Sequence, residues 1–250
     1  MKLGVQTYTI RSIANKNFEL ALNLLSRKGI QKIEFARLKA SPRNAKIIKD
    51  HDFEVLSVQA TYHKLAYKKQ AMLHFCRAVE CHKVVVSVLP ILAILGGRHT
   101  LLRFAKKLNQ LKDFYKTYDI EVGFHHHDFE FKNISGQTKF DMLLKHTDHD
   151  LKFVIDTYWA YSQNVDLKDL IDKIGHRLMG IHLRDYKRLN HKAYKDAEVG
   201  SGMIDFHEVI KHGRLYKPYL VIEQDSKSPM QSIEKSKRFL LDHFKLDIET

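Results

Sequence analysis

Carboxylate and imidazole side chains recur at the ends of short apolar segments of this chain. Glu223 ends the run Tyr-Leu-Val-Ile at 219–222, Asp156 ends Phe-Val-Ile at 153–155, and His182 ends Met-Gly-Ile at 179–181. Oxygen and imidazole ligands without thiolates suit a divalent ion that keeps positions open for substrate oxygens. The sequence therefore predicts a site for Mn²⁺, Mg²⁺, Co²⁺ or Zn²⁺.

Polar residues stand at or just beyond the other expected strand ends as well. They are Gln6, Tyr8, Glu34, Tyr62, His63, His125, His126, His127, Glu130, Asp185 and Asp225. These residues also have structural alternatives, since Asp156 could cap the next helix and His182 could be a hydrogen-bonded core residue. Because alternate residues of a strand point to opposite faces, at most two of the three histidines at 125–127 can face inward. We expect His126 to point outward or to pack against a helix.

Eight short apolar, β-branched segments alternate with stretches that carry apolar residues at helical spacing. The expected strands are Leu3–Tyr8, Lys32–Ala36, Val55–Thr61, Lys83–Leu89, Glu121–His127, Phe153–Tyr158, Met179–Arg184 and Tyr219–Gln224. The expected helices are Phe18–Ser26, Pro42–Lys49, Ala66–Val79, Leu101–Tyr115, Lys139–Lys145, Leu167–Ile174, Phe206–His212 and Ile233–Phe244.

This alternation predicts a parallel sheet, because a parallel connection needs a crossover that a helix normally fills. Eight repeats favour closure, and strand cores such as Val84–Leu89 are mostly apolar, as in strands covered on both faces. The sequence therefore predicts an α/β fold, a (β/α)8 TIM barrel with a parallel eight-stranded closed sheet, in a single domain over 1–250. An open doubly wound sheet is the weaker alternative, since no Gly-x-Gly-x-x-Gly follows the first expected strand. In such a barrel the strand-end residues meet at one rim.

The composition excludes several classes of protein. With 44% hydrophobic residues in 250, the chain can bury a large core, which argues against extended disorder. Its 42 Lys and Arg against 29 Asp and Glu give a net charge of +13, which favours anionic partners without identifying them. Two cysteines fit neither a disulfide framework nor a zinc ribbon, and together with a start that lacks a secretory pattern they favour a cytoplasmic protein. The longest apolar run, 84–95, is too short to span a bilayer, so no membrane partner is expected.

Six segments carry the strand-end residues in a recognisable order. They are Leu3–Arg11, Gly123–Phe131, Val154–Trp159, Gly180–Asp185, Val199–Phe206 and Val221–Asp225. In this order they resemble the sugar phosphate isomerase/epimerase family of xylose-isomerase-like TIM barrels, over nearly the whole chain. The resemblance implies a divalent metal bound by side chains from strands five to eight. It also implies a small carbohydrate partner, that is a keto sugar, polyol or sugar phosphate as substrate.

The ligands that the resemblance implies are Asp156, His182 and Glu223. For the strand-five ligand two alternatives stay open: His125, which the motif match favours, and Glu130.

The chemistry that the resemblance implies is proton transfer next to a carbonyl through a metal-stabilised enediolate. Glu223 is the expected catalytic carboxylate, and Glu130 or His127 is the expected second acid or base. Substrate contacts are expected from Gln6, Tyr8, Glu34, His63, Trp159, Arg184 and Asp185.

Three other functions are alternatives to this one. If His125 replaces a strand-five carboxylate, a lyase like inosose dehydratase becomes an alternative. The superfamily also includes the endonuclease IV type of DNA-repair enzyme, but the His that it has three residues after the strand-six Asp is Trp159 here, so a nucleic-acid substrate is disfavoured. A non-catalytic barrel is the third. The basic segment Arg184–Lys195 is interpreted as a lid or as a solvated loop, and the sequence is compatible with a homo-oligomer.

Overall fold

Eight parallel strands close into a barrel in the computed structural model, which describes residues 1–134, 136–188 and 194–248. Around the barrel the strands follow the order β1-β12-β9-β8-β5-β4-β3-β2. Their bounds are β1 Leu3–Gln6, β2 Lys32–Ala36, β3 Glu54–Ala60, β4 Lys83–Val86, β5 Glu121–His125, β8 Lys152–Asp156, β9 Leu178–Leu183 and β12 Tyr219–Ile222. The (β/α)8 barrel predicted from the sequence is confirmed.

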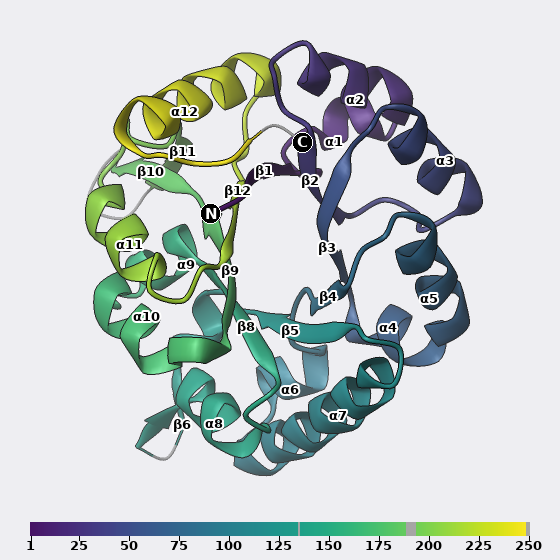
Figure 1. Ribbon diagram of the computed structural model, residues 1–250. Coiled ribbons are helices and arrows are strands. Elements are labelled where there is room, and N and C mark those ends of the chain that lie inside the picture. The colour runs from purple at the N-terminus through teal and green to yellow at the C-terminus, as the bar shows by residue number, and fades with distance from the viewer. Residues whose placement is uncertain (135, 189–193, 249–250) are drawn as a thin grey trace.

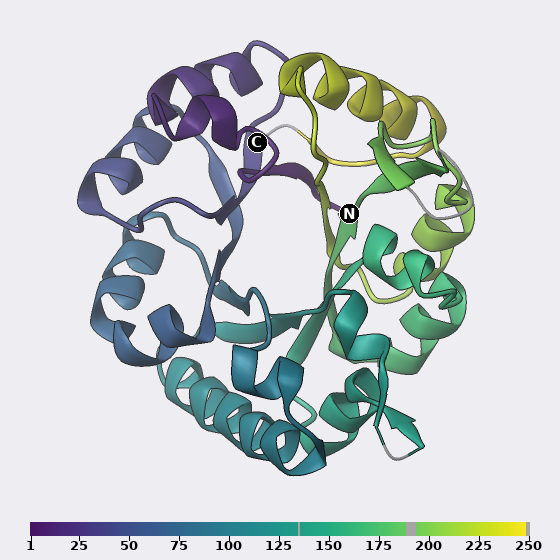
Figure 2. The same cartoon turned by 180° about the vertical axis from the view of Figure 1, so that it is seen from behind.

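Helices surround the barrel and connect successive strands (Figures 1 and 2). They are α1 Arg11–Ala14, α2 Phe18–Ser26, α3 Pro42–Asp50, α4 Tyr62–Tyr67, α5 Lys69–Ala78, α6 Ile91–Leu95, α7 Arg98–Lys116, α8 Lys139–His146, α9 Thr157–Ser162, α10 Leu167–Ile174, α11 Phe206–Gly213 and α12 Pro229–His243. Polar side chains start several of them, as when Asn17 accepts a hydrogen bond from the backbone of Leu20 and Asp166 accepts one from Asp169. Such caps satisfy N–H groups that the helix itself leaves unpaired.

Side chains that alternate along the strands form two separate cores. One set packs between the strands and the helices, and includes Val5, Phe124, Ile155 and Leu220. The other fills the inside of the barrel with Leu56, Val85, Val154, Met179, Tyr219 and Val221. Because the side-chain period of a strand is two, the inward position that follows Val154 is Asp156, and the one that follows Val221 is Glu223.

The structure differs from the sequence-based boundaries in several places. The expected helix 66–79 is two helices, α4 and α5, separated by Lys68. The expected strands five and six end earlier, so the 3-10 helix Asp128–Phe131 and helix α9 begin within a few residues of their ends. The segment Arg184–Lys195 includes strand β10 (Asp185–Arg188) and the start of strand β11 (Tyr194–Ala197), which pairs with it antiparallel, while residues 189–193 lie outside the described residues. Within the described ranges, no helix combines the length and apolarity that a membrane span requires.

Gly180 is a residue that the barrel interior requires to be small. A Cβ atom built there would lie 2.4 Å from the Tyr219 ring. We expect Gly180→Ala to displace this ring and to lower the free energy of unfolding by about 1–3 kcal/mol, as overpacked cores do. Urea titration followed by circular dichroism measures the change. Gly97→Ala is the matched control, since a Cβ at Gly97 meets nothing within 4 Å. Equal stability of the two variants would contradict this account.

Candidate metal centre

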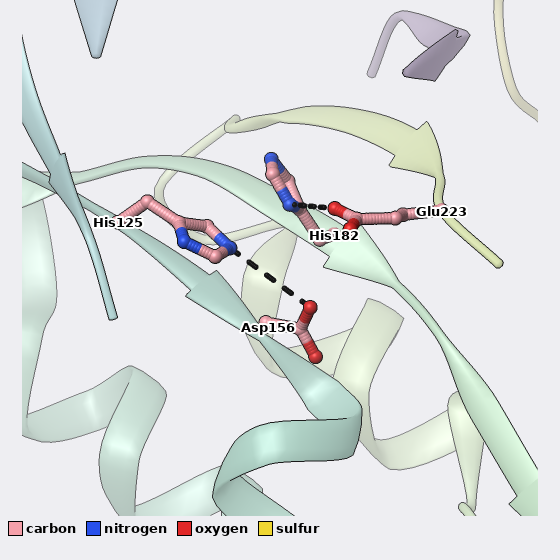
Figure 3. A group of neighbouring side chains, drawn as sticks. All are labelled: His125, Asp156, His182 and Glu223. Atoms are coloured by element: carbon pink, nitrogen blue, oxygen red, sulfur yellow. Dashed lines mark ion pairs between the residues drawn. The ribbon is translucent and has the colours of Figure 1, made fainter. Parts of the chain in front are cut away.

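Four buried side chains from neighbouring strands converge at one end of the barrel. They are His125 from β5, Asp156 from β8, His182 from β9 and Glu223, which directly follows β12. Each offers one ligand atom, and the four atoms lie within 4.8 Å of one another. Figure 3 shows the two ion pairs of the cluster, His125 Nε2 to Asp156 Oδ2 at 3.9 Å and His182 Nδ1 to Glu223 Oε2 at 2.7 Å. These are the four residues predicted as ligands, and metal binding itself stays a prediction.

The parallel register places these residues at one level of the barrel. Asp156 pairs directly with His182 across β8 and β9, and the backbone N–H of Glu223 donates to Leu183 O. His126 points to the other side of β5 and packs on Phe131 and Phe140. The expectation that it packs against a helix is thus confirmed, because Phe140 belongs to α8.

His182 lies between two buried carboxylates. Its Nε2 is 2.7 Å from Glu34 Oε2, and its Nδ1 is 2.7 Å from Glu223 Oε2. Burial by itself would lower the pKa of His182, but the negative charge of Glu34 and the hydrogen bonds to both carboxylates raise it well above its usual range. Burial raises the pKa of Glu223, but the hydrogen bond and charge of His182 outweigh it and leave this pKa lowered.

In the other half of the cluster the polar atoms are further from their nearest partners, with His125 Nε2 3.9 Å from Asp156 Oδ2. Both ring nitrogens of His125 and Oδ2 of Asp156 are buried and lack a hydrogen bond among the described residues. Burial lowers the pKa of His125 to about 3, and the charge of His182 lowers it further in the same direction, so the imidazole is neutral. A neutral imidazole beside a carboxylate is the form that binds a metal. Leaving such atoms unpaired is costly, and a divalent cation would satisfy them.

Asp156 caps a helix with one carboxylate oxygen and directs the other into the cluster. Its Oδ1 accepts a hydrogen bond from the backbone N–H of Trp159 at 3.1 Å and so caps α9. Its Oδ2 remains directed at His125. The cap fixes the carboxylate orientation, so one oxygen is structural and the other is free for a ligand.

Glu34 contacts His182 with one carboxylate oxygen, and two hydrogen bonds hold its other oxygen in place. Its Oε1 accepts hydrogen bonds from Ser57 Oγ and from Tyr219 OH at 2.7 Å. The side chain is fully buried, with no exposed surface. Glu34 thus supports His182 through the carboxylate oxygen that faces it, and the substrate contact predicted for Glu34 stays a prediction.

Two predicted residues face away from the cluster. The Glu130 Oε2 accepts from the backbone N–H of His127 at 2.8 Å and caps the 3-10 helix at 128–131, so His125, and not Glu130, joins the cluster. The oxygens of Asp185 accept hydrogen bonds from five backbone N–H groups, of Tyr186 and of Gly200, Gly202, Met203 and Ile204. Both carboxylates thus hold turns of the backbone, and the catalytic role predicted for Glu130 and the substrate contact predicted for Asp185 stay predictions.

The remaining predicted residues border the cluster or the rim. His127 lies 4.9 Å from His125 between ring centroids, and its buried Nδ1 has no partner among the described residues. Trp159 lies 5.7 Å from His127, and the Arg184 guanidinium is 5.2 Å from the Trp159 ring.

Gln6 and Gln59 contribute amides to the same end of the barrel. Gln6 Nε2 donates to Glu223 Oε2 at 2.8 Å and to Gln59 Oε1 at 3.3 Å. Gln6 Oε1 and Gln59 Nε2 are buried without a partner among the described residues. Sequence reasoning missed Gln59, although its place two residues after Ser57 on β3 could have indicated an inward side chain.

Tyr8 and His63 contact residues outside the cluster. The Tyr8 ring is covered by the Arg11 guanidinium at 3.9 Å. His63 lines a cavity of about 490 Å³ between α4, α6 and α7, together with Tyr62 and Leu89. Their substrate contacts stay predictions.

Removal of the Glu34 charge should lower the affinity of the cluster for a metal. We expect Glu34→Gln to weaken Mn²⁺ binding about 10- to 100-fold, because the amide removes the charge that orients His182. Calorimetric titration of metal-free protein measures the affinity, with Glu121→Gln at the opposite end of β5 as the control. Tyr219→Phe, which removes one hydrogen bond to Glu34, should give a smaller loss. Native affinity in Glu34→Gln would show that His182 needs no such support.

The buried carboxyl of Glu130 should make the stability of the fold depend on pH. Burial raises the pKa of this carboxyl to about 8, against about 4.5 when the chain is unfolded. Between these values the folded state keeps a proton that the unfolded state loses, so stability falls as pH rises from 4.5 to 8. We expect Glu130→Gln, which cannot ionise, to gain Tm relative to the native chain at pH 8 and to differ little at pH 4.5. Thermal melts across this range measure the gap, and a constant gap would disprove the raised pKa.

The chain matches the model of the xylose isomerase-like TIM barrel family over residues 28–243. No curated protein matches it in sequence. Among solved structures it is similar to a sugar phosphate isomerase/epimerase from Parabacteroides distasonis, with 18% identity, a TM-score of 0.80, and 96% of this chain and 97% of the other covered. It is also similar to an L-ribulose 3-epimerase, with 16% identity, a TM-score of 0.73, and 96% and 93% covered.

A third similar structure is an IolI protein that holds a zinc atom. The identity is 14% and the TM-score 0.71, with 97% of each chain covered. Identities this low show a shared fold. Together with the family match over most of the chain and the closed parallel barrel, they establish that this chain belongs to the xylose isomerase-like TIM barrel family.

Proposed function

We propose that this protein is a divalent-metal-dependent isomerase or epimerase that moves a proton next to the carbonyl of a carbohydrate. The observation that carries the proposal is the buried cluster His125, Asp156, His182 and Glu223, with unpaired ligand atoms on its His125–Asp156 side. A divalent ion held there would supply Lewis-acid polarisation of substrate oxygens.

Glu223 is the proposed base. Its lowered pKa keeps the carboxylate ionised at neutral pH, and Gln6 and His182 hold its Oε2 in place. Proton abstraction needs a carboxylate in a fixed position, since general bases act through geometry first. The free amide atoms of Gln6 and Gln59 support binding of substrate hydroxyl groups beside it.

His127 is the proposed second acid or base. Burial lowers the pKa of its ring to about 3, so the imidazole is neutral. Its Nδ1 has no partner among the described residues, and Trp159 lies against the ring. The indole offers an apolar wall of the kind that binds the C–H face of a sugar.

A lyase is the second candidate, supported by the same geometry. His125 occupies the strand-five position of the cluster, and Glu130 lies outside it, so the residue facing Glu223 is an imidazole. With no second carboxylate at this position, Glu223 would pass the proton that it takes from carbon to the departing hydroxyl group, which would leave as water. An inosose substrate fits this reaction.

Solvent exchange tests the proposed function. The Mn²⁺-loaded protein, incubated in D₂O with keto sugars, inosose and sugar phosphates, should place deuterium on one substrate carbon, as seen by NMR. Loss of water would identify the lyase, and exchange without it the isomerase or epimerase. We expect Glu223→Gln to slow exchange by about 10²-fold or more, whereas Glu121→Gln should not. Exchange that survives both EDTA and Glu223→Gln would contradict the proposal.

A further inference from the structure

The cavity of about 490 Å³ between helices α4, α6 and α7 lies outside the metal centre (Figure 1). Its walls come from the segments that follow β3 and β4, and none of its lining residues belongs to the cluster of His125, Asp156, His182 and Glu223. Small-molecule sites in proteins commonly have volumes of about 300–1,000 Å³. The cavity is therefore large enough to hold a small molecule of its own.

Large apolar side chains line this cavity and are exposed to water. Leu89 and Phe104 form buried parts of the wall, whereas Tyr67, Ile91 and Leu92 are 70%, 64% and 73% exposed. Removing apolar surface from water is favourable by about 25 cal/mol per Å². Single exposed apolar residues are normal, but a group of them around one cavity is typical of a binding surface.

The short helix α6 is fixed in the orientation that exposes these side chains. Its Ala93 is buried, and the buried ammonium of Lys139 on α8 donates hydrogen bonds to Ala93 O at 3.1 Å and to Ile94 O. Lysine side chains commonly bind the last carbonyl groups of a helix in this way. Ile91 and Leu92 are thus exposed because the fold holds α6 against α8.

The charged side chains of the cavity are positive. Arg103 and Lys107 line it from α7, where a spacing of four residues places them on one face of the helix. The lining contains no Asp or Glu, and the described residues give neither cation a carboxylate partner. Two cations beside an apolar wall complement a molecule that has one anionic end and an apolar body.

A second copy of this chain is a poorer match to the cavity. Each chain carries a net charge of +13, so two copies repel one another. A protein partner would also have to place carboxylates opposite Arg103 and Lys107. A small amphiphilic anion meets both requirements with a single charged group.

We propose that this cavity binds a free carboxylic acid with an apolar body, of the size of a medium-chain fatty acid. Its carboxylate lies at Arg103 and Lys107, and its apolar body covers Tyr67, Ile91 and Leu92. A guanidinium group binds a carboxylate through two parallel hydrogen bonds, so Arg103 is the expected main polar contact. The site is additional to the metal centre, and the proposed reaction does not use it.

Calorimetric titration with octanoate tests the charged side of the cavity. Octanoate should bind the native protein saturably and about tenfold more tightly than octanol, which lacks the anionic group. We expect Arg103→Gln/Lys107→Gln to remove this difference. Arg27→Gln/Lys106→Gln removes one Arg and one Lys from exposed positions outside the cavity and should preserve it. No saturable octanoate binding, or loss of the difference in both double variants, would overturn the proposal.

Leu92→Ser tests the apolar side. It should weaken octanoate binding about fivefold, because it removes apolar surface that the ligand covers. The matched control is Leu215→Ser, since Leu215 is 67% exposed and lies outside the cavity. Both leucines are on the surface, so both variants should remain folded. Equal octanoate affinities of the two variants would contradict the assignment.

Two further measurements identify the occupant. The octanoate affinity should be the same in EDTA and after loading with Mn²⁺, because the cavity shares no residue with the cluster. Binding that requires Mn²⁺ would place the carboxylate at the metal centre and overturn the proposal. So would light scattering that shows a native dimer and a monomeric Leu92→Ser, since a second copy would then cover the cavity. The titration in EDTA involves no reaction, so its result is independent of whether solvent exchange is found.

Discussion

The site depends on keeping ionisable groups inside a barrel that excludes water. Asp156 and His182 have no exposed surface, and His125 and Glu223 are also buried. Burying unpaired charge is expensive, so each charged group needs a partner of opposite sign or must become neutral. Two carboxylates flank His182, and His125 is neutral. One ligand atom from each of these four residues lies within 4.8 Å of the others, a spacing that one cation would satisfy.

A chain of contacts connects the cluster to the packing of the barrel interior. Gly180 leaves room for the Tyr219 ring, the Tyr219 hydroxyl bonds Glu34, and Glu34 holds His182. The apolar residues inside the barrel thus form the layer against which the polar residues of the cluster pack. The cap made by Asp156 links the cluster in the same way to α9. The contacts that stabilise the barrel interior therefore also position the cluster. A substitution in this interior should alter the positions of the cluster side chains.

Much of this could be predicted from the sequence because it follows from periodicity. Alternation along Val154–Asp156 and Val221–Glu223 identifies inward residues, and eight strand–helix repeats identify the barrel. The contacts of Glu34 could not be predicted. They require the irregular register in which Ile33 pairs with Val55 but Glu34 pairs with Ser57, and a bulge of this kind shifts which side chains face inward.

Contacts set by loops were also beyond sequence reasoning. Asp185 was predicted to face a substrate, yet the backbone of residues 200–204 folds around its carboxylate. Nothing in the spacing of these residues indicates that turn. The same holds for the β10–β11 hairpin, which pairs Lys187 with Lys195.

Metal stoichiometry tests the central claim most directly. Protein stripped with EDTA and dialysed to equilibrium against Mn²⁺ should bind one ion per chain, and both His125→Ala and Asp156→Ala should lose this binding while remaining folded. Absence of saturable binding to the native chain, or full binding by the two variants, would show that the buried cluster is not a metal centre.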